Sequence, residues 1–267
     1  MNSTEFLVTK EYRKFEEFCN ACFREKYIGI CYGAPGVGKT LSARHYSKQD
    51  GFDAYFHVDT PNEEAMKIGK DIMHSRSVFY TAPVMNTPKK IMEELESYRH
   101  DLFCSLYDVN KKVLGKPPEN FQVRSVLILI DEADRLQLKS LEQVRAMYDE
   151  NDWAIILIGM PGIEKRLARY PQLYSRVGFA HEYRPIGQEE MLFIFEHHWN
   201  KLGLELDRKN FADNEAIASI ARITNGNFRL IHRLFSQIKR IMKVNELTAI
   251  TKEVVEAARD CLVIGNI

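Results

Sequence analysis

The first 185 residues alternate between two hydrophobic patterns. Apolar residues recur at spacings of three and four over residues 9–26, which predicts an amphipathic helix. Short apolar runs predict strands at residues 27–32, 54–58, 126–130 and 154–159. Helical patterns are found at residues 39–48, 62–75, 87–112 and 137–149. This alternation predicts a parallel sheet with crossover helices, and so an α/β fold.

The pattern changes near Pro185. Before that point, residues 77–88 carry two prolines and are predicted to form a loop, and the segment after Val177 is predicted to be an edge strand. Beyond Pro185 the strand patterns end and four helices with apolar stripes follow. We therefore predict an αβα core over residues 1–185 and a small all-helical domain over residues 186–267.

The composition is that of an ordinary globular protein. Of the 267 residues, 45% are hydrophobic and 28% are charged. Lysine plus arginine and aspartate plus glutamate both total 37, so the net charge is zero and no overall basic field indicates nucleic acid. Any contact with nucleic acid would need a local patch, or a patch that is repeated around an assembly.

No segment indicates a membrane or an export route. The sequence has no apolar run close to the length of a bilayer span, and its N-terminus, MNSTEFLVTKEYRKF, lacks the apolar core of a signal peptide. We therefore expect a cytoplasmic protein with no membrane partner. Five scattered cysteines, an odd number, predict no disulfide framework. Cys19 and Cys22 form a C-x-x-C pattern within a predicted helix, and without a second ligand pair we interpret them as packed, reduced thiols rather than a zinc site.

A glycine-rich segment follows the first predicted strand. Residues 33–40, GAPGVGKT, match G-x-x-x-x-G-K-[ST], the phosphate-binding loop. Glycines let backbone N–H groups approach phosphate oxygens, while Lys39 supplies a cation for the β- and γ-phosphates and Thr40 a hydroxyl ligand for Mg²⁺. The predicted contacts to ATP are Gly33, Ala34, Pro35, Gly36, Val37, Gly38, Lys39, Thr40 and Leu41. The alternative is a plain glycine turn, but a strand before and a helix after are the context that the motif requires.

Two carboxylates end the most apolar of the predicted strands. The segment VLILIDEADRL runs from five apolar residues into Asp131 and Glu132. Ligands bind at the carboxyl ends of strands in parallel sheets, so we expect Asp131 to hold Mg²⁺, directly or through water, beside the phosphate loop. We expect Glu132 to orient and deprotonate the attacking water. The alternative is an acidic helix N-cap, which Asp131 or Asp134 could equally provide.

Basic residues are frequent between residues 62 and 90. They are Lys67, Lys70, Arg76, Lys89 and Lys90. For any one of them a solvated helix face is the simpler interpretation. Together they could instead form a basic rim that faces a nucleic-acid backbone.

The motifs taken together resemble those of the AAA+ ATPases. They are GAPGVGKT, LILIDEADRL, the Ser175-Arg176-Val177 box and the segment Gly226-Asn227-Phe228-Arg229. The resemblance implies a P-loop αβα core followed by a small helical lid. It also implies that Arg176 is an arginine finger reaching a neighbouring subunit's ATP and that Arg229 is a sensor 2 residue at the γ-phosphate. The alternative for each arginine is a surface or interface ion pair.

One position departs from the AAA+ pattern. Sensor 1 is usually a polar residue after the fourth strand, but the segment IGMPG places Met160 there. A thioether is only a weak hydrogen-bond acceptor and cannot align a water in the usual way. We therefore expect ATP hydrolysis that is slow or that depends on a partner.

Two segments resemble one particular group within the AAA+ ATPases. LILIDEADRL and IGMPGIEKRLARYPQLYSRVGFAHEYRP look like the TniB- and TnsC-type transposition regulators, relatives of the phage Mu B protein. The resemblance implies a homo-oligomer, a ring or filament, that forms on double-stranded DNA with ATP, without sequence specificity, and recruits a transposase, with a target-selector protein as a further partner. The alternatives are a secretion or signalling ATPase that acts on proteins, which the neutral charge favours, and a helicase-loader relative.

Overall fold

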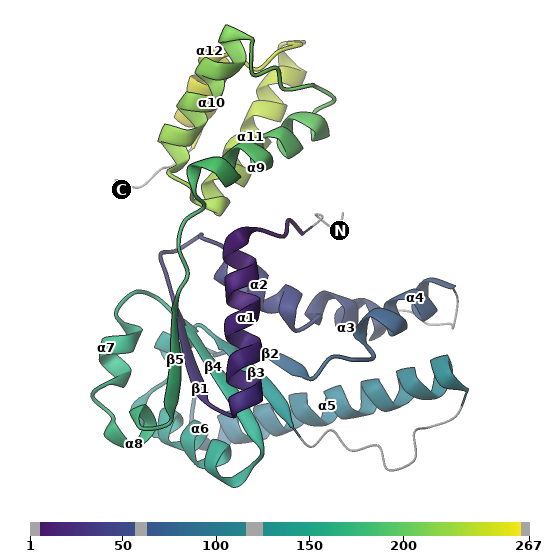
Figure 1. The fold of residues 1–267 in the computed structure, drawn as a ribbon, viewed down its shortest axis with the longest axis vertical. Helices are drawn as coiled ribbons and strands as arrows, with labels where there is room; N and C mark the ends of the chain where they lie inside the picture. The colour runs from purple at the N-terminus through teal and green to yellow at the C-terminus, as the bar shows by residue number, and fades with distance from the viewer. Residues whose placement is uncertain (1–5, 57–62, 116–124, 263–267) are drawn as a thin grey trace. The chain divides into compact units, whose positions relative to one another are not determined.

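A parallel sheet of five strands organises the larger part of the chain (Figure 1). The computed structural model describes residues 6–56, 63–115 and 125–262. Its strands stand in the order β2-β3-β4-β1-β5, and each neighbouring pair is parallel. The strands are β1 (Ile28–Tyr32), β2 (Ser77–Thr81), β3 (Val126–Asp131), β4 (Trp153–Gly159) and β5 (Val177–Glu182). The carboxyl ends of all five strands therefore meet at one edge of the sheet.

The central strands are buried on both faces. Every residue of β3 and β4 is buried, which explains why their sequences are continuously apolar rather than alternating. One face of the sheet packs against α5 (Pro88–Leu114) and α6 (Leu138–Glu150). Both helices share one apolar cluster with Ile128 of β3 and Ile155 of β4. On the other face, Gly29 lets α1 (Lys10–Glu25) approach β1, because an added Cβ would lie only 2.6 Å from Cys22 Sγ.

Shorter helices connect the strands. They are α2 (Lys39–Tyr46), α3 (Gln49–Phe56), α4 (Glu63–Ile72), α7 (Ile163–Leu167) and α8 (Pro171–Tyr174), with a 3₁₀ turn at Ala133–Arg135. The strand β5 closes one side of the sheet as a largely exposed edge strand, as the sequence predicts. Cys19 and Cys22 are buried free thiols, which confirms their interpretation as packed cysteines.

The last part of the chain is helical. It consists of α9 (Gln188–Lys201), α10 (Phe211–Thr224), α11 (Phe228–Val244) and α12 (Lys252–Asp260), which share a separate core around Trp199, Phe195 and Ile238. Residues 184 onward form one compact unit together with the segment up to Glu11 and the loop Ala34–Gly38, and the rest of the chain forms the other unit. Among the described residues, no helix is long and apolar enough to cross a membrane.

The predicted α/β class and the helical C-terminal part are confirmed, but two local predictions are wrong. Residues 54–56 of the predicted strand 54–58 belong to α3, in which Phe52 is buried, and residues 57–58 lie outside the described residues. Residues 77–88 are not one loop, because residues 77–81 form β2, which pairs with β3 along its whole length. Both prolines of that segment follow the strand and so do not interrupt its hydrogen bonds. The domain limits at 185 and 186 stay a prediction.

Candidate nucleotide-binding site

The phosphate-loop motif begins where β1 ends. Gly33 follows the strand directly, and a Cβ there would lie 2.2 Å from the carbonyl oxygen of Tyr183, so this close approach requires glycine. Lys39 opens α2 and is only 9% exposed. Its Nζ donates a hydrogen bond to the Gly33 carbonyl at 2.5 Å. The ammonium group is thus folded back over the loop that the motif assigns to phosphate.

Thr40 and Asp131, which are 91 residues apart in the sequence, meet at the carboxyl edge of the sheet. Thr40 Oγ1 donates a hydrogen bond to Asp131 Oδ2 at 2.7 Å, and the Glu132 N–H donates to Asp131 Oδ1 at 2.9 Å. Asp131 is 4% exposed and forms no ion pair with any residue that the structure describes. A buried carboxylate beside a hydroxyl is the type of oxygen donor set that Mg²⁺ prefers, so the pair fits this ion.

Burial shifts the pKa values of the two charged groups at this edge, Asp131 and Lys39. It raises the pKa of Asp131 above its ordinary value of 3.8, although the hydrogen bond from Thr40 acts in the opposite direction. It also lowers the pKa of Lys39, against the attraction of nearby acidic groups. Charges that are held out of water at a cost in free energy are typical of sites that receive a charged ligand.

Glu132 occupies a strained turn after β3. Its φ of 54° and ψ of 37° are left-handed, which is uncommon for a residue other than glycine and marks functional positions. Its side chain is 46% exposed, and its Oε2 lies 3.8 Å from Nη2 of Arg135. The carboxylate therefore points into accessible space next to the buried Asp131.

Two further residues, to which the sequence analysis assigns no role, hold this turn in place. Arg166 of α7 donates from Nη1 to the Asp134 carbonyl at 2.6 Å and from Nη2 to the Leu136 carbonyl. Asn86, which is buried, donates from Nδ2 to the Arg135 carbonyl at 2.9 Å. No pattern in the sequence indicates these contacts, because each joins a side chain to the backbone of a distant segment.

Met160, at the position expected for sensor 1, has no polar side chain, but its backbone N–H forms a hydrogen bond. The Met160 N–H donates to Asp134 Oδ2 at 2.7 Å, and a Cβ on Gly159 would lie 2.4 Å from the same oxygen. Glycine at this strand end therefore makes room for the Asp134 carboxylate. Asp134 thus links the turn after β3 to the end of β4, a role that the sequence analysis did not assign.

The tip of the phosphate loop contacts the start of α11. Asn227 caps this helix and donates from Nδ2 to the Pro35 carbonyl at 2.8 Å, while the Arg229 N–H donates to the Gly36 carbonyl at 3.0 Å. Gly36 has a φ of 82°, and a Cβ there would lie 2.6 Å from Asn227 Oδ1. The segment Gly226-Asn227-Phe228-Arg229 therefore lies against the tip of the phosphate loop, and the contact of Arg229 with the γ-phosphate stays a prediction.

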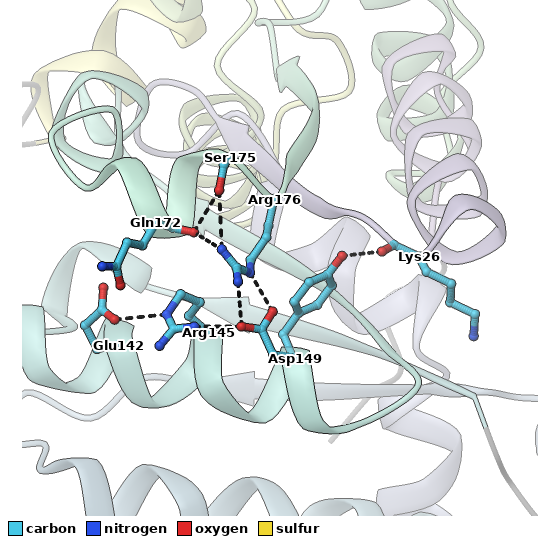
Figure 2. A network of polar contacts seen from close by, with 8 residues as sticks. Lys26, Glu142, Arg145, Asp149, Gln172, Ser175 and Arg176 are labelled. Atoms are coloured by element: carbon cyan, nitrogen blue, oxygen red, sulfur yellow. Dashed lines mark hydrogen bonds and ion pairs between the residues drawn. The ribbon is translucent and has the colours of Figure 1, made fainter.

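Arg176 belongs to a network of charged side chains (Figure 2). Its Nε and Nη2 donate to the two carboxylate oxygens of Asp149, at 2.5 and 2.7 Å. Asp149 also accepts from Arg145 at 2.6 Å, and Arg176 Nη1 donates to the Gln172 carbonyl. The Arg176 side chain is 31% exposed and is held by the carboxylate at one side. Within one chain, Arg176 is therefore part of an ion pair.

Arg176 stands at the opposite edge of the sheet from the phosphate loop. Its carbonyl accepts a hydrogen bond from the N–H of Ile28, the first residue of β1, at 3.1 Å. The phosphate loop follows Tyr32, the last residue of β1, about 13 Å further along at the usual rise of a strand. Arg176 and Lys39 of one chain are therefore not brought together.

Comparison with known proteins agrees with this geometry. Residues 23–167, more than half of the chain, match the model of the AAA domain family. The chain belongs to the AAA domain family. The AAA domain covers β1 to β4 and so includes the phosphate loop, Asp131 and Met160. A protein of Staphylococcus aureus, described as a potential ATP-binding protein, is 48% identical over 264 residues, and the match covers 97% of each chain.

Solved structures show the same AAA fold. The RuvB Holliday junction branch migration motor of Thermotoga maritima superposes with a TM-score of 0.60 at 17% identity, over 97% of this chain and 71% of that chain. The ORC2 protein of Aeropyrum pernix, solved as ADPNP-ADP complexes, gives a TM-score of 0.57 at 14% identity, over 96% of this chain and 69% of that chain. At these identities the likeness concerns the fold, including the helices that follow the sheet.

Proposed function

We propose that this protein is a Mg²⁺-dependent ATPase that assembles on double-stranded DNA and regulates DNA transposition. The hydrogen bond between Thr40 and Asp131 carries the ATPase part, because it joins the phosphate-loop hydroxyl to the buried carboxylate at the end of β3. The family match and the potential ATP-binding relative support nucleotide binding.

Each group then has a role in the reaction. The backbone N–H groups of the loop and Lys39 bind the phosphates, and Thr40 and Asp131 hold Mg²⁺. The metal, when bound, neutralises negative charge on the phosphate oxygens. Glu132 orients the attacking water and accepts its proton. Arg229 contacts the γ-phosphate, and its peptide N–H already bonds the loop tip.

Arg176 acts on the neighbouring subunit. Because it lies at the amino edge of the sheet, about 13 Å along β1 from its own phosphate loop, it cannot reach its own nucleotide. An arginine supplied in trans stabilises the transition state of phosphoryl transfer. Assembly into a homo-oligomer, a ring or a filament, therefore stimulates ATP hydrolysis.

The DNA and transposition parts rest on likeness. The segment from Met160 to Pro185 resembles the TniB- and TnsC-type regulators, and RuvB, which shares the fold, is described as a Holliday junction branch migration motor. A transposase and a target-selector protein are the partners that this proposal requires. Met160 at the sensor 1 position fits an ATPase whose turnover depends on such a partner.

Two variants test the proposal together with the unmodified protein. We expect the protein to form large assemblies on duplex DNA with ATP, measured by light scattering and gel shift at low salt. Lys39→Ala should lose ATP binding and assembly together. Glu132→Gln should bind ATP and assemble, but hydrolyse about 10²–10⁴-fold more slowly, because a general base is lost.

The outcomes separate the competing functions. A protein that stays monomeric with ATP and duplex DNA would overturn the proposal. ATP hydrolysis without DNA binding at any salt concentration would favour a secretion or signalling ATPase. Binding to a replicative helicase, with no stimulation of a transposase, would indicate a helicase loader instead.

A further inference from the structure

The helix α11 has a charge pattern unlike that of the chain as a whole. Its 17 residues, FRLIHRLFSQIKRIMKV, include no aspartate or glutamate, although the whole sequence has a net charge of zero. Four of its basic residues, Arg233, Lys239, Arg240 and Lys243, are all exposed. We refer to these four as the α11 basic stripe.

The stripe lies on the face of α11 opposite its buried face. Ile231, Leu234, Phe235, Ile238 and Met242 of the same helix are buried in the core of the helical unit. At 100° per residue, Arg233, Arg240 and Lys243 lie on the far side of the helix from these residues, with Lys239 at the flank. From Arg233 to Lys243 the stripe is about 15 Å long.

The basic stripe differs from the cations of the long helix α5 in having no ion pairs with the described residues. On α5, the side chains of Lys89, Lys90, Arg99 and Lys112 form ion pairs with Glu93, Glu94, Glu96 and Asp108 of the same helix. No side chain of the stripe forms an ion pair with a residue in the described part of the chain. A row of like charges repels itself and favours an anionic partner that is equally extended.

We propose that the α11 basic stripe binds the phosphate backbone of double-stranded DNA. The inference rests on the proposed function and names the surface by which the protein contacts its DNA. An extended row of single-sign charge matches the regular charges of a duplex, which carries about one charge per 1.7 Å. A membrane surface fits less well, because an interfacial helix inserts its apolar face and that of α11 is already buried in the core.

The helix α11 also contacts the phosphate loop. The N-terminus of α11 bonds the loop tip through Asn227 and Arg229, as described above. The stripe begins one helical turn beyond Arg229. A change at the loop tip on binding ATP would therefore pass directly along α11 to the proposed DNA contact, so we expect DNA binding that depends on ATP.

The salt dependence of DNA binding tests the inference. The full chain would be titrated onto a labelled duplex with a non-hydrolysable ATP analogue over a series of KCl concentrations. The triple variant Arg233→Gln, Arg240→Gln and Lys243→Gln should reduce the slope of log affinity against log salt by about 2 to 3 per subunit. Its affinity at 100 mM salt should fall at least about tenfold.

Two matched variants control for charge and for folding. The triple variant Lys89→Gln, Lys90→Gln and Arg99→Gln removes the same charge from α5 and should keep the slope of the unmodified protein. The variant Arg233→Lys, Arg240→Lys and Lys243→Arg preserves the charges and should also keep it. The basal ATPase activity without DNA should be equal in all of them, which shows that the nucleotide site is intact.

Three results would overturn the inference in different ways. If the stripe variant keeps the unmodified slope, the stripe is not the DNA contact, but the proposed function stands. If the α5 variant alone loses the slope, the contact lies on the basic segment between residues 62 and 90 or on its continuation in α5. If the unmodified protein binds phosphatidylserine vesicles through the stripe but no DNA, both the inference and the proposed function fail.

Discussion

The two edges of the parallel sheet hold charged groups in opposite ways. At the carboxyl edge, Lys39 and Asp131 are buried. Burial lowers the pKa of Lys39 and raises that of Asp131, so it favours the neutral form of each group. At the amino edge, Arg176 and Asp149 are exposed and paired, and the hydrogen bond from Arg176 lowers the pKa of Asp149. The carboxyl edge thus holds charges at a cost in free energy. The amino edge holds them in the ion pair of Arg176 and Asp149 that Figure 2 shows.

The difference indicates what each edge is built to do. Buried charges that are not fully compensated destabilise a fold, so their presence is explained if a charged ligand completes them. An exposed ion pair contributes little to stability and is readily exchanged for another partner. The carboxyl edge therefore suits a permanent binding site for a phosphate and a metal, whereas the amino edge suits a contact that forms on assembly.

The largest expected effect concerns the amino edge. Arg176→Ala should leave ATP affinity unchanged, because Arg176 lies far from its own phosphate loop. It should lower the ATPase rate that assembly stimulates by roughly 10³-fold or more, the usual value of an arginine supplied in trans. The measurement is turnover as a function of protein concentration, together with binding of a fluorescent ATP analogue.

Mixing provides the control for this prediction. Subunits with Arg176→Ala and subunits with Glu132→Gln each lack one half of the proposed composite site, so a mixture should recover part of the activity. Activity that does not depend on protein concentration and is unchanged in Arg176→Ala would show that the arginine is only a surface ion pair, and the contrast between the two edges would lose its meaning.

A smaller effect is expected when the partner of Arg176 is changed. Asp149 binds the guanidinium group within one chain, so under the proposed function it would compete with the phosphates bound by the neighbouring subunit. Asp149→Asn should raise the stimulated rate at subsaturating protein by at most about fivefold, because an exposed ion pair is weak. A rate that falls as far as in Arg176→Ala would show instead that Asp149 orients the arginine.

Most of the sheet could be predicted from the sequence because its central strands are buried. A strand covered on both faces must be apolar throughout, and this signal is plain in Val126–Asp131 and Trp153–Gly159. The strand Ser77–Thr81 was missed because two prolines nearby suggested a loop, although both follow the strand. The helix Gln49–Phe56 was not predicted because its conformation depends on tertiary packing against α4, which local sequence preferences do not reveal.

The candidate site could be predicted only as far as its motifs are local. The sequence predicts that Lys39 and Thr40 lie near Asp131, because the phosphate-loop motif follows one strand and Asp131 ends another at the same edge of the sheet. The contacts of Arg166, Asn86 and Asn227 were not foreseen, because each joins a side chain to a distant backbone carbonyl. Such contacts follow from the tertiary fold and leave no spacing in the sequence.

The smallest expected effect is on stability at the carboxyl edge. The raised pKa of Asp131 means that the folded state binds a proton there more tightly than the unfolded state. This stabilisation is present below the unfolded pKa, near 3.8, and is lost as the pH rises through the folded pKa. At pH 7 the ionised carboxylate therefore costs stability. Asp131→Asn, whose oxygen can accept from the Glu132 N–H and whose amide can donate to Thr40 Oγ1, should raise the Tm without nucleotide by about 2–4 °C.

The dependence on pH and on ligand separates this explanation from simple repacking. The gain in Tm should shrink as the pH is lowered toward about 4, because Asp131 becomes protonated in the unmodified protein. With Mg²⁺ and ATP the order should reverse, since the proposed metal site needs the Asp131 carboxylate and a ligand stabilises only the protein that binds it. Asp149→Asn, which removes a carboxylate with a lowered pKa, should lower the Tm slightly at pH 7. If both substitutions shift the Tm in the same direction, the two edges do not hold their charges in opposite ways.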